Sequence, residues 1–306
     1  MTPRTRYTLA LPGGRTLTLG TRTLVMGIVN VTPDSFADGN VTMDPGRAAD
    51  RALGLEEAGA DLLDVGGEST RPGAERVPAH EEMRRILPVL DRLAGHVRAP
   101  ISVDTYKAEV ARAALDHGAA MVNDISGLAA GPALAGVAAG AGAPLLLMHN
   151  RGSSREMYRY ARYRDVGAEV AAELRTIIGR AVAAGVPREQ LVVDPGLGFA
   201  KRADASLAAL ADLPSLRSLD RPILVGPSRK SFLSAALGDR TPGEREWGTA
   251  AAVAAAACLG AHIVRVHRVA AHVDVVRVAD AIRTAAERDE PVGGEPAVPR
   301  VTEARG

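Results

Sequence analysis

The sequence of 306 residues contains one cysteine, three phenylalanines and one tryptophan, and these shortages exclude several classes of protein. Cys258 alone cannot build a disulfide framework or a cysteine-based zinc site. An aromatic content of 3% argues against proteins that stack single-stranded nucleic acid on aromatic side chains. With 37 basic and 36 acidic residues the net charge is +1, so no overall basic field attracts nucleic acid or an anionic membrane. This composition is typical of a cytoplasmic protein.

No apolar run is long enough for a membrane helix, because the longest, Thr249 to Val264, falls short of the ~20 residues that cross a bilayer. Its alanine-rich part predicts a buried helix from Gly248 to Leu259. The N-terminal residues alternate polar and apolar side chains around Pro12-Gly13-Gly14, which is typical of a β-hairpin rather than a signal peptide. Residues 287–306 are rich in proline, glycine and charge, which predicts a flexible tail.

Short apolar runs, each followed by a longer helical stretch, repeat along the middle of the chain. There are eight: Leu24–Asn30, Leu62–Gly66, Ile101–Asp104, Met121–Asp124, Leu145–His149, Leu191–Asp194, Ile223–Gly226 and Ile263–His267. Apolar strands that alternate with helices indicate a parallel sheet covered on both faces. The sequence therefore predicts an α/β fold, a (β/α)8 TIM barrel over residues 23–286, with an N-terminal β-hairpin (1–22) packed on it. A doubly wound sheet is the alternative, although no Gly-x-Gly-x-x-Gly follows the first strand.

Polar residues or glycine end all of these predicted strands. The carboxyl ends of barrel strands converge on one face, where active sites form. The residues expected at this mouth are Asn30, Asp64, Glu68, Thr70, Arg71, Asp104, Asn123, Asp124, His149, Asp194, Ser228, Arg229, Lys230, Arg265 and His267. Each could cap a helix when taken alone, but together they indicate a binding site.

The charges at this predicted mouth fall into two groups. Asp104 and Asp194 can each accept paired N–H donors from an aminopyrimidine edge. Lys230, Arg265 and His267 follow the last two strands, where barrels commonly bind phosphate. The residues alone thus predict a site for a nitrogen-rich ring beside a phosphorylated group.

Several longer motifs contain these strand-end residues and resemble those of a known family. They are Met26–Asp38 (MGIVNVTPDSFAD), Asp64–Ala74 (DVGGESTRPGA), Ser102–Thr105 (SVDT), Asn123-Asp124, Leu147–His149 (LMH), Asp194–Lys201 (DPGLGFAK), Ser228–Lys230 (SRK) and Arg265–His267 (RVH). In sequence and order they resemble the dihydropteroate synthase family of pterin-binding enzymes. The resemblance implies folate biosynthesis: 6-hydroxymethyl-7,8-dihydropterin diphosphate and p-aminobenzoate would give 7,8-dihydropteroate and pyrophosphate, with Mg2+. It also implies a homodimer that acts on small molecules and binds neither nucleic acid nor membrane.

The resemblance also implies roles for individual residues. The catalytic set would be Asp104, Asp194, Lys230, Arg265 and His267. The pterin would contact Asp104, Asn123, Asp194 and Lys230, and the wider substrate-binding set adds Phe36, Thr70, Arg71, Pro72, Met148, Phe199 and Ser231. Asn30 would ligate the metal and, with Arg265 and His267, surround the diphosphate. In the family's SN1-like route pyrophosphate leaves first, so the site must neutralise charge and exclude water rather than supply a strong base.

Three other functions stay open at this point. A non-catalytic pterin-binding paralogue or a pterin-dependent methyltransferase barrel would share the strand-end carboxylates. A divalent-metal hydrolase is disfavoured because no histidine cluster has ligand spacing. The remaining histidines are expected at the surface: His80, His96, His117, His262 and His272. Arg268 stands where the family commonly has aspartate, and strand alternation predicts that it points outward.

Overall fold

The computed structural model describes residues 3–32, 44–69, 74–152 and 156–287. Four residues of the predicted substrate-binding set, Phe36, Thr70, Arg71 and Pro72, therefore lie outside the described residues. The predicted tail lies outside them beyond Glu287. Expectations for these segments stay predictions.

Eight parallel strands form one sheet in the order β8-β7-β6-β5-β4-β3-β10-β9. They are β3 (Leu24–Asn30), β4 (Leu62–Gly66), β5 (Ile101–Asp104), β6 (Met121–Asp124), β7 (Leu145–Met148), β8 (Leu191–Asp194), β9 (Leu224–Val225) and β10 (Ile263–Val266). A parallel bridge between Val193 and Ile223 joins the two edges of this sheet, which closes it into a barrel. The predicted (β/α)8 fold is confirmed, and five of the eight strands have the predicted bounds.

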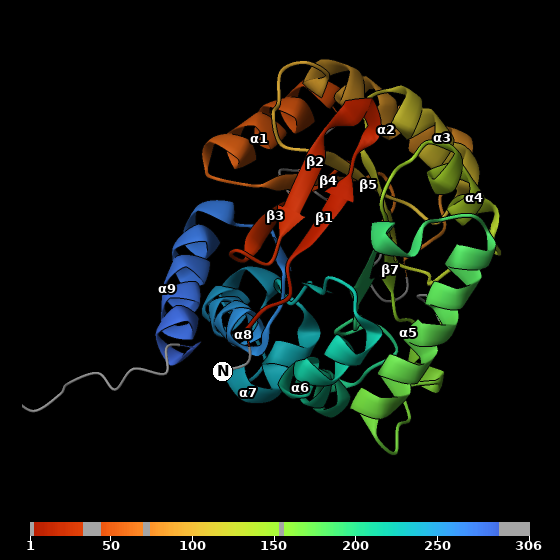
Figure 1. Cartoon of the computed structure of the whole chain (residues 1–306). Coiled ribbons are helices and arrows are strands. Elements are labelled where there is room, and N and C mark those ends of the chain that lie inside the picture. Colours follow the sequence, from red (N-terminus) through yellow and green to blue (C-terminus); the bar gives the residue numbers. More distant parts are fainter. Residues whose placement is uncertain (1–2, 33–43, 70–73, 153–155, 288–306) are drawn as a thin grey trace, which may run out of the picture.

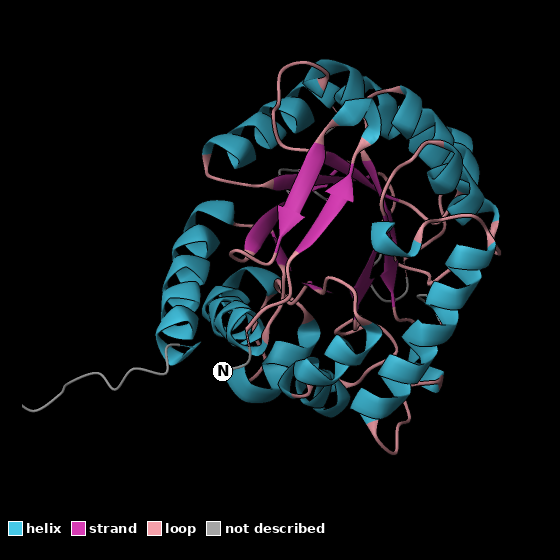
Figure 2. Cartoon of the chain, in the orientation of Figure 1, coloured by secondary structure: helices cyan, strands magenta, loops and turns pink. Residues whose placement is uncertain are grey.

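Helices surround the barrel in a ring (Figure 1, Figure 2). They are α1 (Pro45–Glu57), α2 (Ala79–Leu93), α3 (Ala108–Asp116), α4 (Ala133–Gly140), α5 (Val166–Ala183), α6 (Ala203–Ala211), the short α7 (Ser234–Leu237), α8 (Glu246–Leu259) and α9 (Val269–Glu287). Outward-facing strand residues such as Val25, Leu63 and Val103 pack against the buried faces of these helices. In the described part of the chain, no helix combines the length and the apolar character that crossing a membrane requires.

A hairpin of β1 (Tyr7–Ala10) and β2 (Thr16–Leu19) lies across one end of the barrel, shown in red in Figure 1. Its buried leucines, Leu9, Leu11 and Leu19, pack against the inward-facing residues at the start of the strands. Those residues include Leu24, Met26, Leu62, Met121, Leu146, Val192, Leu224 and Ile263. The predicted N-terminal hairpin is therefore present, and it seals the amino-terminal end of the barrel with apolar side chains.

Two histidines contradict the expectation of surface positions. His262 is 4% exposed beneath the hairpin: its Nδ1 accepts from the Ile223 amide at 3.1 Å, and its Nε2 lies 3.0 Å from the Thr5 carbonyl oxygen. Burial lowers the pKa of His262 to about 4. His272 is fully buried on the face of α9 that packs on the barrel, with Nδ1 2.6 Å from the Arg268 carbonyl oxygen. Both lie on faces that other elements cover, which sequence position alone does not reveal.

Candidate active site

The carboxyl end of the barrel interior is polar because strand residues alternate between the two faces of the sheet. Further along the strands, the polar residues expected to face inward by this alternation are Asn30, Asp64, Asp104, Asn123, Asp194, Arg265 and His267. The register places Asp104 beside Asn123 across β5 and β6, and Met148 beside Asp194 across β7 and β8. The structure thus brings these predicted site residues to one end of the barrel.

Arg265 ties together two carboxylates inside this mouth. Its Nε donates to Asp64 Oδ2 at 2.6 Å, and a terminal nitrogen donates to Asp104 Oδ2 at 2.7 Å. The Asn123 amide also donates to Asp64 Oδ2, at 3.1 Å. Asp64 was expected at the mouth but given no role, and the sequence offered no signal that it would pair with Arg265. Its second oxygen, Oδ1, is buried without a hydrogen-bond partner among the described residues.

The charges of this cluster depend on one another. Burial raises the pKa of Asp104, and the Arg265 guanidinium opposes the rise. Burial also disfavours the charged form of Arg265, but the Asp64 and Asp104 carboxylates outweigh it and raise the pKa of Arg265. The guanidinium therefore keeps its charge inside the barrel and supports the ionised form of Asp104.

Lys230 approaches the mouth from the loop after β9. Its Nζ donates to the Leu197 carbonyl oxygen at 2.6 Å and lies 4.5 Å from the centre of the Phe199 ring. Burial lowers the pKa of Lys230 to about 8, while the Asp194 carboxylate opposes this shift. Burial in turn raises the pKa of Asp194, and Lys230 opposes that rise. Asp194 also accepts from the Gly196 amide at 2.7 Å, which fixes one of its oxygens.

His267 is held at the end of β10 by a serine from the neighbouring strand's loop. Ser228 Oγ lies 2.9 Å from His267 Nδ1, and the His267 amide donates to the same hydroxyl at 3.2 Å. These contacts orient the imidazole beside Arg265. Ser231 lines a cavity of about 200 Å3 together with Tyr158, Lys201, Arg202, Ala203 and Phe232.

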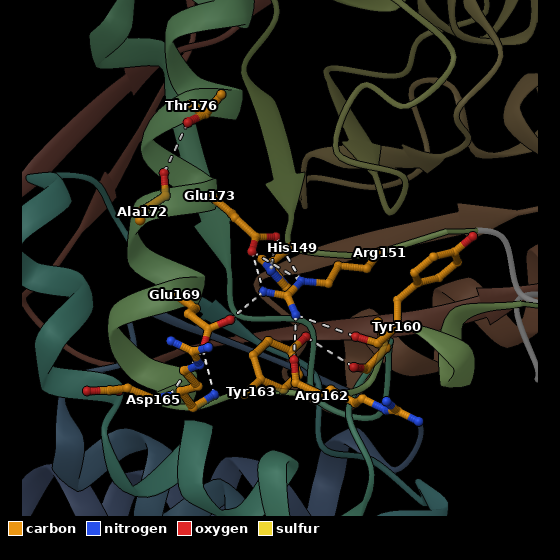
Figure 3. Close-up of polar contacts among 12 residues, drawn as sticks. His149, Arg151, Tyr160, Arg162, Tyr163, Asp165, Glu169, Ala172, Glu173 and Thr176 are labelled. Carbon is orange, nitrogen blue, oxygen red and sulfur yellow. Dashed lines mark hydrogen bonds and ion pairs between the residues drawn. The ribbon is translucent and has the colours of Figure 1, made fainter.

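Three residues expected at the mouth face elsewhere. Asp124 caps a turn by accepting from the Ser126 and Leu128 amides. His149 pairs with Glu173 of α5 (Figure 3), and Arg229 pairs with Glu246 of α8 at 2.9 Å. For Asp124 and His149 the reason is alternation, because each follows an inward-facing strand residue and so points outward. Arg268 is exposed, as expected.

Asn30 is the residue through which this mouth would hold Mg2+. The described residues contain no group of three or more histidine, cysteine or acidic side chains that could hold a metal ion. Asn30 ends β3, and its side chain is half-buried. Mg2+ commonly takes only one or two protein oxygens and completes its shell with phosphate and water. The amide oxygen of Asn30 is therefore a donor of the kind that this ion accepts.

Comparisons with known proteins agree with this geometry. Residues 26–267 match the model of the family described as pterin binding enzyme. The dihydropteroate synthase of Synechocystis sp. is 46% identical over 273 residues, which cover 89% of this chain and 94% of that protein.

Two solved structures of the Xanthomonas albilineans dihydropteroate synthase are also similar. The one with 4-aminobenzoic acid has a TM-score of 0.84 at 45% identity, covering 91% of this chain and 99% of that one. The one in complex with 7,8-dihydropteroate has a TM-score of 0.80 at 42% identity, covering 89% and 98%. A barrel with this mouth, matched over nearly its whole length, leaves one assignment: the chain belongs to the pterin-binding enzyme family, as one of its dihydropteroate synthases.

Proposed function

We propose that the mouth of the barrel joins 6-hydroxymethyl-7,8-dihydropterin diphosphate to p-aminobenzoate, with release of pyrophosphate. The observation that carries this proposal is the placement of carboxylates and an amide beside two cations, Lys230 and Arg265, and the His267 imidazole at one end of the barrel. Asp104, Asn123 and Asp194 suit the N–H-rich edge of a pterin, because carboxylate oxygens accept hydrogen bonds and the asparagine amide can both donate and accept them. Lys230 and Arg265 then stand next to this edge.

The main chemical task of the site is to neutralise the charge of the leaving diphosphate. The bond between the methylene carbon and the diphosphate oxygen breaks, and its electron pair leaves with the oxygen. Negative charge therefore grows on the diphosphate while positive charge grows on the pterin-linked carbon. Arg265 and His267 would neutralise the departing anion, since fixed charges aimed at developing charge are a large source of rate enhancement. Lys230, whose pKa of about 8 keeps it largely protonated at neutral pH, would add to this field.

The arylamine completes the reaction. Its nitrogen forms the new C–N bond and then releases a proton, so a weak acceptor such as water or the departing pyrophosphate suffices. Ser231 and Lys230 would line the p-aminobenzoate side, with Met148 and Phe199 completing the apolar lining. Thr70 and Pro72, outside the described residues, would line the same side, and Phe36, also outside them, would close over it and keep water from the cation.

Mg2+ would be held by Asn30 together with diphosphate oxygens, as the donor set allows. When bound, it would supply positive charge that stabilises the leaving diphosphate.

We also propose that the chain acts as a homodimer in the cytoplasm. Exposed apolar side chains lie on two late helices that pack together: Trp247 of α8 is 87% exposed, and Val278 and Ile282 of α9 are 61% and 53% exposed. Such side chains favour a protein interface. The single cysteine is compatible with a reducing compartment.

Product formation from purified components tests the proposal. Pyrophosphate is expected only when the dihydropterin diphosphate, Mg2+ and p-aminobenzoate are all present, apart from slow background hydrolysis. A protein that binds the pterin but gives no amine-dependent product would instead be the non-catalytic paralogue. Transfer of a methyl group from a pterin would support the methyltransferase alternative.

A further inference from the structure

Lys201, at the end of the loop after β8, is a buried ammonium to which the proposed reaction gives no role. It is 1% exposed, and its Nζ lies 2.7 Å from His149 Nδ1, 3.2 Å from the Phe199 carbonyl oxygen and 3.3 Å from the Gly196 carbonyl oxygen. A protonated lysine has three donors and no acceptor. Each donor therefore has one acceptor here, and His149 carries its own proton on Nε2.

His149 connects Lys201 to a carboxylate on α5. His149 Nε2 donates to Glu173 Oε2 at 3.0 Å, and Arg151 Nε lies 3.1 Å from both oxygens of Glu173 (Figure 3). The hydrogen bond from His149 is the main cause that lowers the pKa of Glu173 to about 2. Buried charges need such partners. The Lys201 charge is thus compensated through a histidine by a carboxylate that stays ionised.

The loop that Lys201 holds, Gly196 to Ala200, has an unusual backbone. Gly196, Gly198 and Ala200 all have positive φ angles, of 68°, 78° and 48°. A Cβ on Gly196 would lie 2.1 Å from the His149 carbonyl oxygen, so the loop passes very close to the end of β7. A left-handed alanine costs free energy and persists only when its surroundings impose it.

Hydrogen bonds from side chains supply that constraint. Each residue of this loop has a carbonyl oxygen that accepts a hydrogen bond from a side-chain donor. The donors are Lys201 to Gly196 and Phe199, Lys230 to Leu197, Tyr158 to Gly198 and Tyr163 to Ala200. The loop therefore lies between two lysines, one in the protein interior and one in the active site.

We propose that Lys201 is a positioning residue for the pterin site. By fixing the Gly196 and Phe199 carbonyls, it fixes the Leu197 carbonyl and Phe199 ring that locate Lys230. The same loop supplies the Gly196 amide that orients Asp194. The inference rests on the proposed function in one respect, that the pterin lies against Asp194 and Lys230.

The protonation of Lys201 gives this role a pH dependence. Burial lowers the pKa of Lys201 to about 7; Asp194 of β8 and Glu173 of α5 oppose that shift, and Lys230 and Arg151 reinforce it. His149 faces the same ammonium in neutral form, because burial lowers its pKa. A neutral amine donates two hydrogen bonds rather than three, so one of the three acceptors loses its donor as the pH rises through about 7. Pterin affinity should fall over the same pH range.

The direct test measures the dissociation constant of dihydropterin diphosphate with Mg2+ and without p-aminobenzoate. Lys201→Met keeps the side-chain volume and removes the donors, and we expect affinity to fall about tenfold or more at a temperature where thermal melts show the variant to be folded. The part of the pH dependence near 7 that Lys201 causes should be lost in this variant, whereas Asp104, whose pKa burial raises to about 7, still titrates. Arg188→Met is the matched control, since it removes a cation that donates to the Leu219 carbonyl at 2.8 Å at the opposite end of the barrel. It should change the affinity less than about twofold.

Chemical rescue separates positioning from mere folding. Lys201→Ala should bind the pterin weakly, and propylammonium chloride should restore part of the affinity because it replaces the missing methylenes and ammonium. Tetramethylammonium chloride at the same ionic strength has no N–H donor and should not. Rescue by both salts equally would overturn the proposal.

Two further variants keep the outcomes distinct. If Lys201→Met does not fold, Glu173→Gln on α5 provides the test, because the Glu173 side chain is 39% exposed. We expect this variant to lose about threefold in affinity for dihydropterin diphosphate. Wild-type affinity in Lys201→Met, or in Glu173→Gln when that variant must serve, overturns the positioning role. Wild-type affinity in Lys230→Ala would instead show that the pterin binds elsewhere, and that result would overturn the proposed site itself.

Discussion

The two ends of the barrel are built from the same strands and could hardly differ more. At the amino-terminal end, Leu9 and Leu19 of the hairpin are fully buried against an apolar layer. At the carboxyl end, two to four residues further along, Asp64, Asp104 and Arg265 form an ion-paired cluster. β10 holds both layers, with Ile263 in one and Arg265 in the other. Stability and chemistry are thus separated along the barrel axis, and mutations at the two ends should affect different measurements.

The largest effect is expected from Arg265→Ala at the carboxyl end. If Arg265 neutralises the departing diphosphate, turnover should fall by about 10²–10³, because such contacts strengthen as charge develops. Steady-state assays of pyrophosphate release measure this loss. Arg268→Ala provides the control on an exposed neighbour and should stay within a few-fold of wild type. Equal losses in both variants would place Arg268 in the pocket.

Leu19→Ala at the amino-terminal end should have the opposite profile. Leu19 is fully buried, and removing its side chain leaves a cavity that costs about 3 kcal/mol of unfolding free energy. Denaturant titration should register this loss, while kcat/KM at a temperature well below the transition stays near wild type. A large fall in kcat/KM in the folded variant would show that the two ends are coupled.

His262 gives the amino-terminal end a pH dependence of its own. Its pKa is about 4 in the folded protein and about 6.5 when unfolded, so the unfolded state binds the extra proton between these values. Stability should therefore fall as the pH drops from 6.5 to 4, by up to about 3 kcal/mol from this residue alone. Urea titrations across that range should show a shallower fall for His262→Gln, which can still accept from Ile223 and donate to Thr5. If the stability of His262→Gln falls with pH as much as that of the wild type, other titrating groups cause the pH dependence.

The smallest expected effect, from Asp194→Asn, concerns binding alone. Asparagine can still accept from the Gly196 amide, but the charge-assisted bonds to the pterin N–H groups are lost. Pterin affinity should fall by at least about tenfold with little change in the thermal midpoint. Calorimetric titration and thermal melts of the same sample measure both. A variant with a much lower thermal midpoint that still binds the pterin normally while folded would make Asp194 a structural residue.

Much of the fold was predictable because its signals are local. Each strand is a short apolar run, and the polar residue that ends it marks the boundary, as at Asn30, Asp104 and Asp194. Alternation also predicts which strand-end residues face inward. Applied to Asp124 and His149, it predicts side chains that face away from the mouth, as the structure shows.

The rest depends on partners that are distant in sequence. The ion pair of Arg265 with Asp64 spans 201 positions, and no local pattern specifies it. The burial of His262 depends on the hairpin from the other end of the chain, which supplies the Thr5 carbonyl. Lys201 stands in a recognisable motif, yet only the folded structure shows that its ammonium is enclosed and paired with His149.

The closure of the sheet has a consequence for the dynamics of the protein. β9 has two residues, and its connection to β8 is the single bridge from Val193 to Ile223. Among the described strands this seam has the fewest cross-strand contacts, so its amides should exchange with solvent sooner than those of β3 and β4. Asp194 and Lys230 stand on opposite sides of the seam. A substrate that contacts both residues would stabilise the pairing of β8 with β9. Its binding would then slow the hydrogen exchange of the amides in these two strands.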